Sequence, residues 1–222
     1  MSLSAVPRLS RLPPVRYVRA PEPVHFPEEG SVPEGYFHQI MRAFLFQLLQ
    51  FVLGEEHTVN SDQFVYWDAS SPRSCLAPDV CVRLNMRQSI AGTWKVWERG
   101  GPPELAVEIV SPSEDDGIDW DEKLRRYHAL GVGELVRFDP EAPRGSRIRV
   151  WDRVKDDLVE RHVEGEATHC ATLRLTWAIR PMDNWPEALR LLDAEGNLVL
   201  SRVETAEARV RELEEELRRR RG

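Results

Sequence analysis

The chain has 222 residues, of which 41% are hydrophobic and 30% are charged, as in a globular protein with one core. It has no apolar run near the roughly 18 residues of a membrane helix, and its N-terminus lacks the apolar segment of a signal peptide. The net charge of -7 argues against a basic surface that coats nucleic acid non-specifically. The three cysteines, Cys75, Cys81 and Cys170, lack metal-type spacing, so we expect free thiols in a cytoplasmic protein.

The N-terminal part divides into an arm and a helix. Residues 1–33 are rich in proline without periodicity, which predicts an extended arm. Residues 34–53 carry apolar side chains at steps of three and four and end before Gly54, which predicts an amphipathic helix packed on a sheet. Near its start, Glu34 and His38 are candidate accessory site residues. We favour the simpler alternative, in which Glu34 interacts with the helix dipole and His38 is a surface or boundary histidine.

Two strands are predicted next, at 64–67 and 75–84. The second contains Asp79, within Ala-Pro-Asp-Val at 77–80, just ahead of an alternating apolar run.

Residues 85–103 form a connection long enough to suggest a functional loop. Its aromatic and basic side chains, with one from the preceding strand, are candidates for binding nucleic acid: Arg83, Arg87, Trp94 and Lys95. An equally favoured alternative is that the tryptophans fold this loop back onto the sheet or onto a partner subunit.

An apolar run at 105–110, interrupted only by Glu108, lies between Gly-Gly-Pro-Pro and Ser-Pro-Ser and predicts a buried strand. A buried charge is costly unless it is paired or binds a metal. Asp119 is suited to cap the next helix, at 119–130, where Lys123 lies one turn before Tyr127 and therefore faces the sheet. Glu104 is either a third acid on the same side of the strand as Glu108 or, as we favour, only the strand entrance.

Asp79, Glu108 and Lys123 together suggest metal-dependent hydrolysis of phosphodiesters. Carboxylates suit a hard cation such as Mg²⁺, which polarises the phosphate, and a lysine can orient or deprotonate the attacking water. Each residue also has a structural explanation, because Asp79 can cap a turn and Glu108 can form a buried salt bridge with Lys123. Their predicted convergence favours a site.

The rest of the chain predicts a strand at 134–138, parallel to the Glu108 strand, and a hairpin at 147–151 and 158–163. A further strand or turn is expected around Trp177 and Ile179, and a short helix at 185–192. From Ser201 onward, a helix carries a coiled-coil seam that either supports a dimer or lies on its own domain, with the seam residues Val203, Ala206, Val210, Leu213 and Leu217.

These motifs resemble the Uma2 family (DUF820) of restriction-endonuclease-like proteins, a branch of the PD-(D/E)XK nuclease superfamily. The matching segments are residues 77–80, Pro-Pro-Glu-Leu-Ala-Val-Glu-Ile-Val-Ser-Pro-Ser at 102–113, Lys123 with Tyr127, and Gly131-Val132 leading to Asp139-Pro140. The superfamily usually places its lysine two residues after the second acid. Here that position is Val110, and Lys123 fits the Uma2-like position in the following helix.

The resemblance implies an α/β fold, a restriction-endonuclease-like mixed β-sheet flanked by helices. The resemblance covers roughly residues 30–190. Together with the proline-rich start and the charged end, it divides the chain into an arm (1–33), an endonuclease domain (34–200) and a charged C-terminal helix (201–222). It further implies an endonuclease that acts on nucleic acid, with DNA as the favoured substrate. The seam of the C-terminal helix adds the expectation of a homodimer. Asp79, Glu108 and Lys123 would be catalytic, and Asp79, Glu108 and the Ile109 carbonyl would hold Mg²⁺ or Mn²⁺. The alternative is a catalytically silent nuclease fold that serves as a nucleic-acid-binding or dimeric scaffolding module, which the acidic net charge favours.

Overall fold

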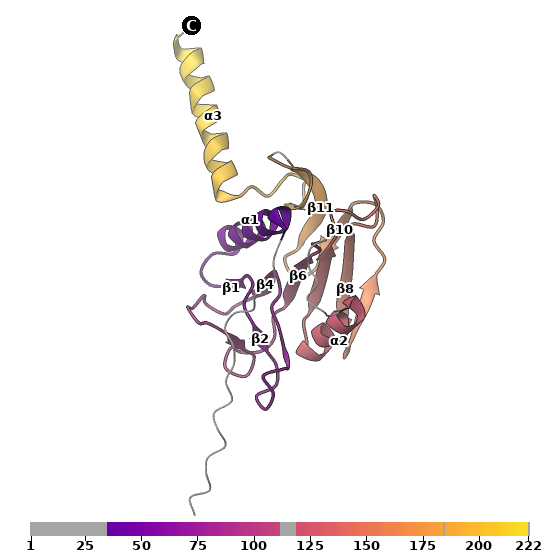
Figure 1. The fold of residues 1–222 in the computed structure, drawn as a ribbon. Coiled ribbons are helices and arrows are strands. Elements are labelled where there is room, and N and C mark those ends of the chain that lie inside the picture. The colour runs from indigo at the N-terminus through magenta and orange to yellow at the C-terminus, as the bar shows by residue number, and fades with distance from the viewer. Residues whose placement is uncertain (1–34, 112–118, 184, 222) are drawn as a thin grey trace, which may run out of the picture.

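A six-stranded mixed sheet, in the order β1-β4-β6-β7-β8-β9, forms the centre of the protein (Figure 1). A computed structural model describes residues 35–111, 119–183 and 185–221 of the chain. The strands are β1 (Thr58–Asn60), β4 (Val80–Arg83), β6 (Leu105–Ile109), β7 (Glu134–Phe138), β8 (Ile148–Val154) and β9 (Asp157–Arg161). β6 and β7 are parallel and the other neighbouring pairs are antiparallel. Helix α2 (Trp120–Leu130) connects the parallel pair, so the predicted βαβ unit and the β8–β9 hairpin are confirmed.

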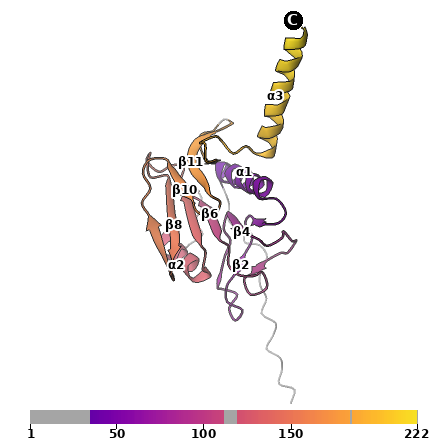
Figure 2. The same cartoon turned by 180° about the vertical axis from the view of Figure 1, so that it is seen from behind.

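The two faces of this sheet are covered by different elements (Figures 1 and 2). Helix α1 (Tyr36–Leu53) packs through Met41, Leu45, Leu48 and Leu49 against the side chains of Val80, Val82, Leu105 and Val107. Helix α2 packs through Tyr127 and Leu130 against Cys81, Ala106 and Leu135. Because side chains alternate along a strand, Glu108 is in phase with Ala106 and faces α2.

Two small sheets complete the fold. One has the order β3-β2-β5 and consists of β2 (Val65–Tyr66), β3 (Cys75–Leu76) and β5 (Trp94–Lys95). The predicted strand at 75–84 is therefore two strands, β3 and β4, separated by the Ala-Pro-Asp segment at 77–79. The other small sheet has the order β10-β11-β12.

The prediction of a helix at 185–192 was wrong, because these residues form strand β12 (Trp185–Leu192). It pairs with β11 (Leu175–Met182), which in turn pairs with β10 (Ala167–Cys170). Residues 188–192 are all buried, and Ala188, Leu189 and Leu191 join the core that contains α1. Long pairing and burial on both faces override the local helical spacing.

The predicted C-terminal helix is present as α3 (Arg202–Arg221), and it extends away from the rest of the protein (Figures 1 and 2). The Ser201 hydroxyl accepts a hydrogen bond from the Glu204 amide at 3.3 Å, and the Glu204 carboxylate accepts one from the Ser201 amide at 2.7 Å. This reciprocal capping box fixes where the helix begins. Within the described residues, no helix is both long and apolar enough to cross a membrane.

Candidate active site

The two predicted acids lie side by side at the ends of adjacent strands. Val80 of β4 is paired with Val107 of β6 in an antiparallel register, so Asp79 is level with Glu108. Asp79 is 7% exposed and Glu108 is 4% exposed. The backbone N–H of Ile109 donates to Asp79 Oδ2 at 2.6 Å. This hydrogen bond connects the Asp79 carboxylate directly to the residue after Glu108.

Helix α2 brings two further side chains onto Glu108. The Lys123 ammonium nitrogen lies 2.6 Å from Glu108 Oε2, and the Tyr127 hydroxyl donates to Glu108 Oε1. Lys123 and Tyr127 are on the same face of the helix in successive turns. The helix is positioned at its start by Asp119, which accepts a hydrogen bond from the Glu122 amide at 2.8 Å.

The end of α2 also has a defined geometry. Gly131 ends the helix in the left-handed conformation with a φ of 87°. A glycine adopts this conformation without the steric penalty that a Cβ would bring. Asp119 and Gly131 therefore determine where α2 begins and ends, and Lys123 and Tyr127 reach Glu108 from the helix between them.

The protonation of Glu108 is strongly influenced by its surroundings. Burial raises the pKa of Glu108 to about 7, with the Asp79 carboxylate adding to this rise and the Lys123 ammonium opposing it. Burial and the Glu108 carboxylate raise the pKa of Tyr127 well above its usual value, so its hydroxyl stays a hydrogen-bond donor. A raised carboxyl pKa means that negative charge is disfavoured here, and a bound cation would relieve that cost.

His38 belongs to this site, contrary to the favoured prediction of a surface or boundary histidine. It is 1% exposed, and its Nε2 lies 2.9 Å from Asp79 Oδ1. His38 is in phase with the buried Met41 and Leu45 of α1, and that periodicity was the signal that could have revealed its burial. The other candidate near the start of this helix, Glu34, lies outside the described residues.

Glu104 lies at the opposite end of the β4–β6 pair and is not part of this cluster. Its carboxylate accepts a hydrogen bond from Arg83 Nη1 at 2.6 Å and another from the Leu84 amide at 2.9 Å. Four residues of extended strand separate Glu104 from Glu108, or about 13 Å. These contacts agree with the favoured interpretation of Glu104 as the strand entrance.

The proposed stacking surface is not formed by Trp94. This side chain is 1% exposed, packs in the core beneath α2 and donates from Nε1 to the Gly101 carbonyl at 3.2 Å. A buried ring cannot stack on a nucleobase, so the assignment of Trp94 to substrate binding was wrong. The alternative, in which a tryptophan folds this loop back onto the protein, describes Trp94.

The three basic candidates have acidic neighbours. Arg83 is bound to Glu104 and also donates to the Pro102 carbonyl at 3.0 Å. Lys95 lies 3.5 Å from Glu98, and the exposed Arg87 lies 3.6 Å from Glu55. Arg87 is accessible as a surface cation and Lys95 is partly buried, whereas Arg83 holds the loop to the strand.

A cavity of about 300 Å³ adjoins the site on the side of α1. His38, Val110 and Ser111 line it, together with residues from the start of α1 and of β12. Glu108 and Lys123 are not among its lining residues. The cavity therefore borders the acid cluster through His38, which contacts Asp79.

The donor set is compatible with a hard cation. Among residues 35–111, 119–183 and 185–221, there is no group of three or more His, Cys, Asp and Glu side chains arranged to hold a metal ion. The site instead offers two neighbouring carboxylates, and Mg²⁺ is commonly bound through one or two carboxylates while it keeps several waters. Asp79 and Glu108 fit that mode of binding.

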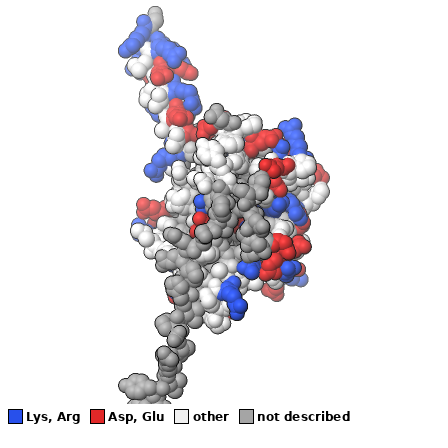
Figure 3. Space-filling model, in the orientation of Figure 1, with Lys and Arg blue, Asp and Glu red and all other residues white. Residues whose placement is uncertain are grey.

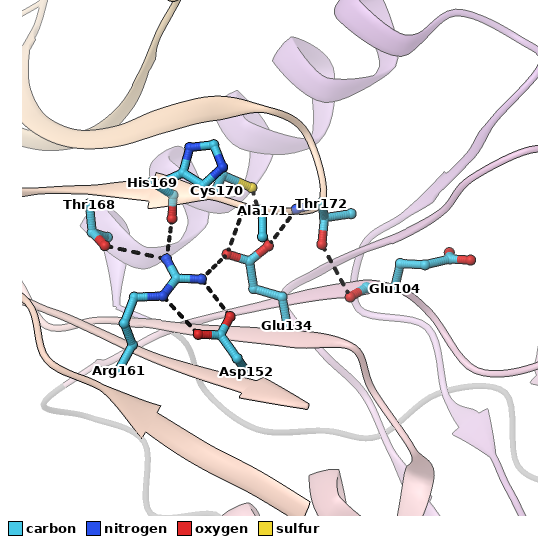
Figure 4. Close-up of polar contacts among 9 residues, drawn as sticks. All are labelled: Glu104, Glu134, Asp152, Arg161, Thr168, His169, Cys170, Ala171 and Thr172. Carbon is cyan, nitrogen blue, oxygen red and sulfur yellow. Dashed lines mark hydrogen bonds and ion pairs between the residues drawn. The ribbon is translucent and has the colours of Figure 1, made fainter. Parts of the chain in front are cut away.

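Sequence reasoning missed a third buried acid, Glu134, at the start of β7 (Figure 4). Its carboxylate accepts hydrogen bonds from the Ala171 amide at 3.1 Å and the Thr172 amide at 2.9 Å, and it lies 3.3 Å from Arg161 Nη2. Arg161 also donates to Asp152 at 2.8 Å. Glu134 pairs in register with Leu105, at the other end of β6 from Glu108, so this network joins the β10–β11 segment to the central sheet.

The fold and the cluster together fit the nuclease class, in which acids on neighbouring strands are combined with a lysine. The chain belongs to the Uma2 family, whose model is described as "Putative restriction endonuclease" and matches residues 29–183. This membership confirms the resemblance found in the sequence.

A structural neighbour carries a related description. It is the crystal structure of "a putative nuclease belonging to DUF820" from Anabaena variabilis ATCC 29413, with 13% sequence identity and a TM-score of 0.43. The match covers 59% of this chain and 69% of that one. No curated protein matches the chain.

Proposed function

We propose that this protein is an endonuclease that uses a divalent cation to hydrolyse phosphodiester bonds in DNA. The observation that supports this most strongly is the convergence of Asp79, Glu108 and Lys123, with a separation of 2.6 Å between the Lys123 ammonium and the Glu108 carboxylate. The family description supports a nuclease of the restriction type, for which DNA is the substrate. In this proposal, residues 34–200 are the endonuclease domain and residues 201–222 are an appendage.

The proposed metal ligands are Asp79, Glu108 and the backbone carbonyl of Ile109, with Mg²⁺ or Mn²⁺ as the cation. A bound cation of this kind polarises a phosphate and lowers the pKa of a coordinated water. The chain's own contribution is to hold the two carboxylates side by side, through the Ile109 amide and His38 on Asp79 and through Tyr127 on Glu108.

Lys123 is proposed as the residue that positions the attacking water. Its ammonium reaches the acid cluster from α2, whereas Val110, at the usual superfamily position of the lysine, carries no charge. An ammonium beside the reacting phosphate stabilises the negative charge that develops as water adds and one ester P–O bond breaks. The lysine would thus act from the helix that follows the strand.

Cleavage of supercoiled plasmid and single-stranded DNA in Mg²⁺ or Mn²⁺ tests this function. We expect the native protein to cut and Glu108→Gln and Lys123→Ala to be slower by roughly a hundredfold or more. Glu104→Gln is the matched control, because it removes an acid from the same stretch of chain but outside the cluster, and it should cut like the native protein. Thermal melting of each variant separates loss of chemistry from loss of fold.

Two other outcomes are informative. If all four proteins cut equally, the activity comes from a contaminant and the site assignment fails. If no protein cuts although each is folded, the silent binding or scaffolding module becomes the better account.

A further inference from the structure

The apolar side of helix α3 is exposed to solvent. Four large apolar side chains are 42–61% exposed: Val203, Val210, Leu213 and Leu217. The described part of α3 contains no buried residue. Figure 3 shows side chains of both charges interspersed with uncharged ones along this helix. An apolar stripe of this kind is normally covered by a partner.

The spacing of the stripe is that of a two-stranded coiled coil. Val203, Val210 and Leu217 recur every seven residues and occupy the a positions, while Ala206, Leu213 and Arg220 occupy the d positions. A β-branched residue at a with leucine at d favours two strands in parallel coiled coils, and the central heptad, with Val210 and Leu213, has this combination. At 20 residues, α3 is about 30 Å long and contributes just under three heptads.

The charges beside the stripe identify the occupant and its direction. In a parallel pair, each g residue faces the e residue that lies five positions later in the partner helix. The three such pairs are Arg202 with the partner's Glu207, Arg209 with the partner's Glu214, and Glu216 with the partner's Arg221. All three combine opposite charges, and two-fold symmetry repeats each one. We propose that two copies of this chain associate through α3 as a parallel two-stranded coiled coil in this register.

The antiparallel arrangement is less complementary. There, e residues face e residues, and the e positions hold Glu207, Glu214 and Arg221. Contacts that Glu207 and Glu214 make with each other or with their own copies join like charges, which is destabilising, and only contacts with Arg221 join opposite charges.

The base of α3 is joined firmly to the rest of the protein. Arg190, which is buried in β12, donates to the Glu204 carboxylate at 2.7 Å, and its guanidinium lies 4.8 Å from the Phe44 ring centroid. The Arg202 guanidinium lies 5.6 Å from the ring centroid of Phe51 in α1. A parallel pair would therefore hold both globular parts at the same end of the coil. This inference does not depend on the proposed hydrolysis.

Charge reversal at one g–e′ pair tests both the association and its direction. Arg209 and Glu214 are more than half exposed, and their contacts within the helix, to Glu212 and Arg218, are surface ion pairs that contribute little. In a homodimer of Arg209→Glu, the new acid faces the partner's Glu214, and two-fold symmetry gives two such acid–acid contacts. In a homodimer of Glu214→Arg, the new base faces the partner's Arg209, which gives two base–base contacts. Each variant alone should dimerise roughly tenfold more weakly than the native chain.

A mixture of the two variants provides the decisive comparison. In a parallel heterodimer both altered pairs again combine opposite charges, so an equimolar mixture should recover native-like association. Arg211→Glu, at an outer b position, is the matched control and should dimerise like the native chain. Masses from light scattering over about 5–200 µM give the dissociation constants.

Native protein that stays monomeric at the highest concentration would overturn the proposal. So would variants that fail to recover in the mixture, because only the parallel register pairs these two positions. Equal weakening by Arg211→Glu would also count against it, since the effect would then come from net charge.

Discussion

Replacing Glu108 with glutamine should change how the stability of the fold depends on pH. Burial and the Asp79 carboxylate raise the pKa of Glu108 from 4.5 to about 7, against the opposing effect of Lys123. Between pH 4.5 and about pH 7, Glu108 therefore carries more bound proton in the folded state than in the unfolded chain. Its contribution to stability is thus fully present below about pH 4.5 and is lost as the pH rises through about 7.

The size of this loss follows from the two pKa values. At about 1.4 kcal/mol for each pH unit, a rise from 4.5 to about 7 corresponds to about 3 kcal/mol, most of it lost between about pH 5 and pH 8. Glutamine has no charge to lose or gain in this range. The free energy of unfolding of Glu108→Gln, relative to the native chain, should therefore rise by about 2 to 3 kcal/mol from about pH 5 to pH 8.

Urea unfolding of both proteins in a metal chelator measures this difference. Groups that titrate alike in the two proteins cancel, so the difference reports the charge on Glu108 together with its electrostatic effect on Asp79 and Lys123. Glu104→Gln serves as the control, because it removes an acid from the same stretch of chain but outside the cluster. If the difference in free energy of unfolding between Glu108→Gln and the native chain stays constant from about pH 5 to pH 8, the argument that burial disfavours the charged form of Glu108 is refuted.

Three further changes test the structural part of the account. Glu134→Gln should lower the free energy of unfolding by about 1–3 kcal/mol, because a buried network loses its charged acceptor, and a change below about 0.5 kcal/mol in urea unfolding would contradict this. Trp94→Ala should cost about 3–5 kcal/mol by the same measurement while leaving DNA affinity unchanged in the folded fraction, and a selective loss of DNA binding would restore the stacking role. Ser201→Ala should weaken the start of α3 by about 1 kcal/mol, seen as lower helical circular dichroism and faster proteolysis near that residue, and unchanged proteolysis would show that the cap contributes little.

The central unit of the fold and the acid cluster were predictable because their signals are local. The short apolar run around Glu108, the Asp119 cap and the Gly131 stop together define a strand, a helix and their connection. Lys123 and Tyr127 share a helix face, so their direction toward the sheet follows from spacing alone. Only the register of β4 against β6, which sets Asp79 level with Glu108, required the structure.

The errors have tertiary causes. Trp185, Leu189 and Leu192 are spaced as on a helix, yet pairing with β11 and burial make this segment a strand. His38 is a polar residue in phase with an apolar stripe, and residue type alone suggested the surface. For Trp94, the sequence left exposure and burial equally open, because an aromatic side chain suits either a binding surface or a core.

The account depends most on the claim that Asp79 and Glu108 hold a divalent cation. Calorimetric titration of the native protein with Mn²⁺, beside Asp79→Asn, Glu108→Gln and the Glu104→Gln control, tests this directly. The account predicts saturable binding to the native and control proteins and a loss of affinity of at least tenfold in the other two. Equal binding by all four proteins, or none by the native protein at millimolar Mn²⁺, would contradict it.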